Sequence, residues 1–278
     1  MNHWKMALIV GIMLVVIAGT YGFAQGAGRK PYHQEYSFDF GGIEKIRVSE
    51  VDSQIHVIPG EGNEIRVDIA GSLGKSEYPI EAEIKGGQLV IERKTSISSF
   101  FVFNFGRRAS VINVYVPQGY GKDIEISSVS GSVDIHPVKA KGLTIDTIAG
   151  EITLSGVACD TVKLSTVSGN ISAQSLKTRE SKVSSTSGRI ELADFAGDFD
   201  GKNVSGKVAV AYARFDNNVR VDTVSGGIEL TLTGAEDFKL ETSSISGRVS
   251  NEFDAKTLGN GKNHIRLETV SGRMTVKR

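Results

Sequence analysis

The sequence is poor in cysteine and proline and carries no net charge. Of its 278 residues, one is cysteine and five are proline, and 32 basic side chains balance 32 acidic ones. A single cysteine, Cys159, excludes an internal disulfide framework and a cysteine-based metal cluster, and we interpret it as a small buried apolar residue. Nucleic-acid binders usually carry a basic stripe, so the charge balance argues against a nucleic-acid partner.

Metal-ligand patterns and helical periodicity are also missing. The histidines are scattered without the spacing of zinc ligands: His3, His33, His56, His136 and His264. The periodic Gly-Gly-x-Gly-x-Asp motif of calcium-binding repeats is absent, and no stretch after residue 24 has a convincing helical period. The sequence therefore predicts no metal site, no cofactor and no catalytic residue.

What the chain has in excess is glycine, 32 residues, and a recurrence built on it. A Ser-Gly or Ala-Gly pair recurs eight times, at intervals of 19, 19, 19, 18, 20, 21 and 25 residues. The glycines of these pairs are Gly131, Gly150, Gly169, Gly188, Gly206, Gly226, Gly247 and Gly272. A fixed period in this range is typical of a solenoid or an array of repeats.

Each repeat has the pattern of two short strands separated by a corner. Apolar residues stand two and four positions after the glycine, as in Ile152 and Leu154, and another stands five before it, as in Ile145. The apolar residue two before the glycine, such as Ile148, is out of phase with the preceding strand, which indicates a corner. Linkers are too short for helical crossovers. We therefore predict an all-β, parallel β-solenoid of about eight coils, each stacked directly on the last.

The corner residues suggest how the coils approach one another. We expect the glycines to adopt positive φ and to let neighbouring coils come close. A Ser, Thr or Asn stands three residues before each glycine, for example Thr147 and Thr166. Its parity matches the buried strand positions, so we expect these side chains to point inward and to hydrogen-bond along the stack.

The part of the chain before the first glycine is less regular. Residues 25–35 are interpreted as a linker, residues 36–120 as an irregular β region with degenerate coils, and residues 121–278 as the regular repeats. A segment around Ser53 fits the repeat with serine in the place of glycine, and Gly86 and Gly87 are typical of a hairpin turn.

Residues 1–24 form a targeting segment, which we expect to be helical. A lysine, Lys5, precedes an apolar run, and residues 6–24 carry no charge, which is almost enough to span a bilayer. Small residues at Gly22 and Ala24 also fit signal-peptide cleavage. The segment is either a transmembrane anchor in the cell membrane or a cleaved signal that releases a secreted protein. Both interpretations place the remaining chain outside the cytoplasm.

The Val-Tyr-Val-Pro approach at residues 114–117 and the repeating Val-Ser-Gly-x-Ile-x-Leu resemble the DUF4097 family of β-strand-repeat proteins, described as candidate adhesins. The resemblance covers residues 43–278. Its layout, with a short N-terminal membrane segment, is similar to members from Gram-positive bacteria, and implies a role in the cell envelope that is connected with envelope stress. It implies no catalytic residues.

One apolar stretch outside the targeting segment is a candidate contact surface. As a strand, it would place Phe101, Phe103 and Phe105 on one face, next to Arg107 and Arg108. Three phenylalanines would expose about 600 Å², near the upper limit for monomers. The segment is either a cap over the first coil or a contact for a partner or for anionic headgroups.

We therefore expect a membrane-anchored, extracytoplasmic binding or scaffold protein that contacts the membrane and an envelope protein or polysaccharide. Two alternatives stay open: a polysaccharide-active enzyme and a structural spacer that presents a regulatory partner. The outward acids lie two or more coils apart, which does not match the spacing of about 5–9.5 Å between glycosidase carboxylates. No enzymatic activity is therefore predicted.

Overall fold

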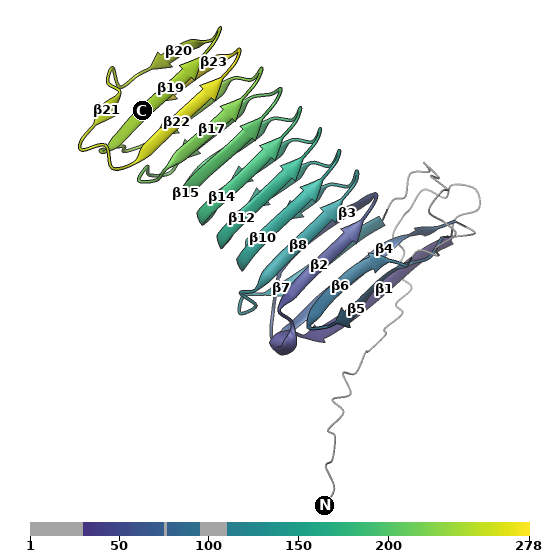
Figure 1. Ribbon diagram of the computed structural model, residues 1–278. Helices are drawn as coiled ribbons and strands as arrows, with labels where there is room; N and C mark the ends of the chain where they lie inside the picture. The colour runs from purple at the N-terminus through teal and green to yellow at the C-terminus, as the bar shows by residue number, and fades with distance from the viewer. Residues whose placement is uncertain (1–29, 75–76, 95–109) are drawn as a thin grey trace, which may run out of the picture.

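The protein is an elongated stack of β-strands (Figure 1). The computed structural model describes residues 30–74, 77–94 and 110–278, and these form 23 strands and one 3-10 turn, Phe40–Gly42. The all-β prediction is confirmed. The N-terminal hydrophobic helix expected in residues 1–24 lies outside the described residues. Among the described residues, none belongs to a helix long and apolar enough to cross a bilayer.

The strands form two sheets that share β15 (Ile190–Asn203), which starts in sheet A and ends in sheet B. Sheet B contains β2 (Lys45–Glu50), β5 (Ile80–Lys85), β6 (Gln88–Arg93), β8 (Asp123–Ser128), β10 (Lys139–Thr147), β12 (Ala158–Thr166), β14 (Lys177–Ser185), β17 (Val219–Thr223), β19 (Phe238–Ser244), β21 (Thr257–Leu258) and β22 (His264–Thr269). Sheet A contains β1 (Lys30–Asp39), β3 (Ser53–Gly60), β4 (Glu64–Leu73), β7 (Ser110–Pro117), β9 (Val133–Ile135), β11 (Ile152–Ser155), β13 (Ile171–Gln174), β16 (Val208–Tyr212), β18 (Ile228–Leu232), β20 (Arg248–Asn251) and β23 (Arg273–Lys277).

In the centre of the stack, residues one repeat apart lie side by side in parallel strands. Ile145 pairs with Leu164 in sheet B, and Ile152 pairs with Ile171 in sheet A. We call one sheet B strand and the sheet A strand that follows it a layer. The glycine-centred recurrence therefore corresponds to layers held by backbone hydrogen bonds to the layers above and below.

The interior of the stack is filled from both sheets by alternating side chains. Ile145 and Ile152 are fully buried, as the period-two pattern predicts. The residues seven positions after the first four glycines, such as Val157 and Leu176, are buried as well. Toward the C-terminal end, aromatic rings replace aliphatic side chains: the ring centroids of Phe195 and Tyr212 are 5.2 Å apart, and those of Tyr212 and Phe215 are 5.1 Å apart.

The N-terminal end contains two further layers that the glycines do not mark. The layer formed by β2 and β3 lies between the β8–β9 layer and the layer formed by β6 and β7. The prediction that Ser53 stands in the place of a corner glycine is confirmed, because the backbone of Gly131 packs against Ser53. The region that we expected to be irregular therefore continues the stack, with its layers in reversed order along the chain.

Antiparallel strands close this end. β4 pairs with β7, β1 pairs with β4, and β5 pairs with β6 through a turn in which Gly86 and Gly87 have φ of 56° and 76°. The predicted hairpin is confirmed. The linker prediction for residues 25–35 is wrong from Lys30 onward, because β1 begins there and forms a full antiparallel ladder with β4.

At the C-terminal end, the last two layers exchange places (Figure 1). The last strands of the chain, β22 and β23, pair with β17 and β18 on one side and with β19 and β20 on the other. The C-terminal layer is thus inserted between the two layers that precede it in sequence. The expectation that each coil stacks directly on the last is wrong here, because the long connection after β20 lets the chain return inside its own end.

Candidate functional site

The residue three before each glycine closes the corner from inside. Thr147 Oγ1 accepts a hydrogen bond of 2.9 Å from the N–H of Gly150, and Thr166 Oγ1 accepts one of 2.9 Å from the N–H of Gly169. Both threonines are buried, as their parity predicted. Most of these bonds stay within one corner instead of running along the stack as we expected. Two bonds join adjacent layers: Thr223 Oγ1 donates to Thr269 Oγ1 at 2.9 Å, and Asn203 Nδ2 donates to Gly188 O at 2.8 Å.

The corner glycines allow the layers to approach one another. A Cβ on Gly169 would collide with the carbonyl oxygen of Gly150, and a Cβ on Gly188 would collide with that of Gly169. Seven of the eight glycines have no positive φ in the left-handed range, and Gly206, at 159°, lies at its limit. The expectation of positive φ is therefore wrong, and close packing against the next layer is the reason that these positions require glycine.

The apolar residue two before the glycine points outward at the same corner. It is half exposed in nearly every layer: 52% for Ile148, 48% for Val167 and 47% for Val204. In their order along the stack, the members of this apolar stripe, in which Thr186 is the one hydroxyl-bearing residue, are Val51, Val129, Ile148, Val167, Thr186, Val204, Val224, Val270 and Ile245. Nine residues at one strand spacing, about 4.8 Å, extend over about 38 Å.

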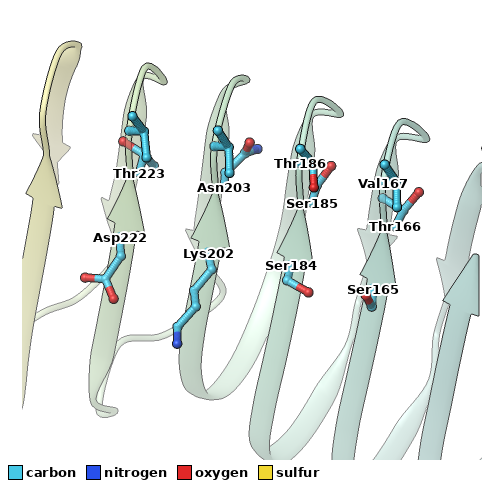
Figure 2. A pocket seen from close by; sticks show the side chains of 12 residues that line it. Ser165, Thr166, Val167, Ser184, Ser185, Thr186, Lys202, Asn203, Asp222 and Thr223 are labelled. Carbon is cyan, nitrogen blue, oxygen red and sulfur yellow. The ribbon is translucent and has the colours of Figure 1, made fainter. Parts of the chain in front are cut away.

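A shallow groove of about 430 Å³ runs beside the stripe across four layers (Figure 2). It is lined by residues around the corner of β12, β14, β15 and β17, and Lys202 and Asp222 project from the strands at its edge. Serines of the corner are already bonded to the layer below, as in Ser168 Oγ to Ile148 O at 3.3 Å. The face is thus apolar along its crest and has charged groups on its sides.

The charges beside the stripe are not evenly distributed. The Ile148 layer carries two acids, Asp146 on the sheet B side and Glu151 on the sheet A side, whereas the Val204 layer carries Lys202 and Lys207 in the corresponding positions. These four side chains lie at the surface. The stripe is therefore flanked by acids on both sides in the Ile148 layer and by bases on both sides three layers further on.

A carboxylate bridge links three layers on the sheet A side. Glu229 contacts Lys207 and Lys277, and hydrogen bonds from these two ammonium groups lower its pKa to about 2. Lys277 belongs to the inserted C-terminal layer. The trio keeps a net positive charge, since two lysines share one carboxylate.

The sequence did not reveal a cluster on β1 and β4. The Nε2 atom of His33 lies 2.6 Å from Asp68 Oδ1 and 3.6 Å from Glu35 Oε1. The antiparallel pairing of Glu35 with Asp68 brings these residues together, although 33 positions separate them in the sequence. Neighbouring strands hold a second pair, His56 Nδ1 and Asp134 Oδ2 at 3.4 Å. Histidines that we considered scattered therefore have acidic partners, which only strand register could reveal.

Two predicted features have different outcomes. The candidate contact surface of Phe101, Phe103, Phe105, Arg107 and Arg108 lies outside the described residues. Cys159 is buried, and burial together with the charge of Asp160 raises the pKa of its thiol to about 12, so the thiol stays protonated at neutral pH.

Similarity to known structures extends over nearly the whole chain, at low identity. A cell adhesion candidate from Clostridium sporogenes is 14% identical with a TM-score of 0.36, and the match covers 89% of this chain and 99% of that one. A lipid-binding candidate from Parabacteroides distasonis is 16% identical with a TM-score of 0.49 and coverages of 90% and 98%. An adhesin candidate from Parabacteroides merdae is 10% identical with a TM-score of 0.46 and coverages of 91% and 97%.

Family membership follows from the sequence profile. No curated protein matches the chain in sequence. The profile described as Toastrack DUF4097 matches residues 43–277, which include both the degenerate layers and all eight glycine-centred repeats. The chain therefore belongs to the Toastrack DUF4097 family.

Proposed function

We propose that this protein is a non-catalytic β-solenoid scaffold of the cell envelope, anchored by residues 1–24, which binds its partner along the apolar stripe. The observation that carries the proposal is the stripe itself. With about 70 Å² exposed per side chain, its members present about 600 Å², the upper limit of what monomers normally expose, and patches of this size mark interaction sites.

The shape of the stack supports binding over catalysis. Its strands are fixed by hydrogen bonds to both neighbouring layers, so the stripe is a rigid, pre-organised surface that loses little entropy on association. Surface acids are paired with bases in their own neighbourhood, as in Glu125 with Lys45 at 2.8 Å and with Arg47 at 3.1 Å. Such ion pairs are typical of the solvated face of a strand and not of carboxylates that transfer protons.

A pull-down with full-length protein in nanodiscs tests the proposal. Isolated peptidoglycan and envelope polysaccharide are offered as ligands, and extracted envelope proteins are offered in parallel. Replacing Val167 and Val204 with Asp should abolish capture while the melting temperature changes little, because both side chains are already half exposed. Lys182→Asp, on the outer face of sheet B, is the matched control and should bind normally.

The outcomes separate the three functional classes. Capture without release of soluble fragments supports the scaffold, whereas release of new sugar ends supports a polysaccharide-active enzyme. Absence of both, or capture that is unchanged in the stripe variant, rejects an envelope ligand bound along the stripe and favours a spacer.

The anchor is tested separately by N-terminal mass spectrometry. An uncleaved chain should stay with the membrane fraction through a high-salt wash. Recovery of a soluble chain that begins at Gln25 would show that the segment is a cleaved signal.

A further inference from the structure

We propose that the occupant of the apolar stripe is a second copy of this chain, packed antiparallel about a twofold axis between the Val167 and Thr186 layers. The proposal rests on the proposed function, because it names the partner of the same surface. It follows from the spacing of the stripe, from the distribution of charge beside it, and from its area.

The spacing of the stripe selects a partner with the same period. Its side chains are β-branched and stand one per layer, about 4.8 Å apart. A surface that contacts every one of them over the full length must repeat at the same interval. The stripe of another copy does so by construction, so each side chain of one copy can pack against one side chain of the other.

The charges decide the direction. In the antiparallel arrangement, the third layer of the stripe, that of Ile148, faces the sixth layer, that of Val204. A twofold axis that lies across the stripe keeps the sheet A sides together and the sheet B sides together. Glu151 of one copy then faces Lys207 of the other, and Asp146 faces Lys202, in two symmetric sets. These positions follow from the layer order and from the exposure of the four side chains.

A parallel pair is disfavoured by the same residues. A twofold axis along the stripe places each layer against its own copy with the sheet A side facing the sheet B side. Asp146 would then meet Glu151, and Lys202 would meet Lys207, so that like charges approach at both layers. Such contacts suppress a wrong orientation.

The area is sufficient for a specific dimer. A standard interface buries about 800 Å² on each partner. The stripe supplies about 600 Å² of apolar surface, and the serines and charged residues on its two sides supply the polar rim. The interface would be isologous and closed, as in most homodimers.

Site-directed cross-linking of the full-length chain in nanodiscs tests the pairing. A chain carrying both Ile148→Cys and Val204→Cys should form a covalent dimer with a short bifunctional maleimide, because each cysteine faces the other cysteine of the partner. The two positions are three layers apart, about 14 Å, so a linker of about 8 Å cannot join them within one chain. The single variants are controls that should stay uncross-linked, and the buried thiol of Cys159 should not react.

Charge reversal gives an independent readout that does not depend on folding. We expect Asp146→Lys or Lys202→Asp alone to weaken the dimer at least about tenfold, because each change acts twice in the symmetric interface. The double variant should return to within about threefold of the original affinity. Recovery in the double variant cannot arise from a damaged fold.

The result also separates this proposal from the function on which it rests. Full-length protein that stays monomeric at micromolar concentration, with no cross-link in the double cysteine variant, overturns the dimer. Should that monomer still capture polysaccharide, lipid vesicles or an envelope protein through Val167 and Val204, the stripe is a binding surface with another occupant. Should stripe variants change neither capture nor association, both proposals are wrong.

Discussion

The two ends of the stack meet the same requirement in different ways. At the N-terminal end, the outermost parallel layer is covered by the antiparallel strands β1, β4 and β5. At the C-terminal end, the outermost layer pairs on its outer side, among the described residues, only with the two-residue strand β21. Phe253, from the loop between β20 and β21, packs on Phe238 with ring centroids 5.0 Å apart. At both ends, the outermost layer is not the one nearest to the chain terminus in sequence. The β2–β3 layer lies inside the β6–β7 layer, and the β22–β23 layer lies inside the β19–β20 layer.

The comparison shows that the exposed sheet edges at an end of the stack can be covered by further strands or can carry polar residues. Val249, in the outermost C-terminal layer (β19–β20), is 44% exposed, whereas Ile171, at the same position of a central layer, is fully buried. The last layer also carries Thr242 and Asn251 where other repeats have apolar residues. A terminal layer that offers little apolar edge is less prone to pair with other chains.

The largest expected effect separates the centre from the end. Ile171→Asp places an unpaired charge in the core and should lower the free energy of unfolding by more than about 4 kcal/mol. Val249→Asp, at the equivalent position of the exposed last layer, should cost less than about 1 kcal/mol. Chemical denaturation of the full-length protein measures both. Asn170→Asp, next to the central site, is a nearly neutral control, and an Ile171→Asp variant that melts within a degree or two of wild type contradicts the layer packing.

At the N-terminal end, a buried ion pair should matter next. Glu50, whose side chain is 2% exposed, lies 3.5 Å from the guanidinium of Arg93, and Arg93 also donates to Tyr78 O at 2.7 Å. Arg93→Met leaves the carboxylate with Ser53 as its remaining hydrogen-bond donor among those described, and should cost about 3 kcal/mol. The double variant Glu50→Gln/Arg93→Met should recover most of that loss. Equal losses in the two variants would mean that Arg93 acts through packing.

The carboxylate bridge at the inserted layer predicts a pH dependence. The pKa of Glu229 is about 2 in the folded protein, below its ordinary value of 4.5. Its contribution is therefore complete above pH 4.5 and is lost as the pH falls toward 2. Because its side chain is 31% exposed, solvent screening reduces that contribution to about 1 kcal/mol. The difference in unfolding free energy between wild type and Glu229→Gln should disappear near pH 2, and an unchanged difference from neutral pH downward contradicts the assignment.

The smallest effect concerns the C-terminal cap, by which we mean the packing of Phe253 over Phe238. The guanidinium of Arg278 lies 5.2 Å from the ring centroid of Phe253. Arg278→Ala should cost about 0.5 kcal/mol, the value of an exposed cation–π contact. Amide hydrogen exchange should accelerate around Phe253 and not in the central layers. Acceleration spread over the whole stack would show that the cap controls global unfolding.

Much of the fold follows from local patterns in the chain. The eight corner glycines, the alternating strands beside them and the serine that replaces glycine at Ser53 could all be recognised by spacing. The exchange of the last two layers was missed, although two signals were present. The interval before Gly272 is 25 residues, longer than the others, and Thr242 and Asn251 break the apolar pattern in the layer that becomes outermost. A spacing pattern predicts which residues form a layer but not which other layer packs beside it.

The sequence by itself determined which residues form a layer, because an alternating strand and a glycine corner are decided within one repeat. Only the tertiary structure decided what lies beside each layer. The stripe exists because corner residues that are far apart in sequence lie one strand spacing apart. The same stacking sets how far apart the charges of Asp146 and Lys202 lie. His33 and Asp68 meet through antiparallel register alone. Contacts between layers depend on the order of the whole stack, which long connections leave open in the sequence.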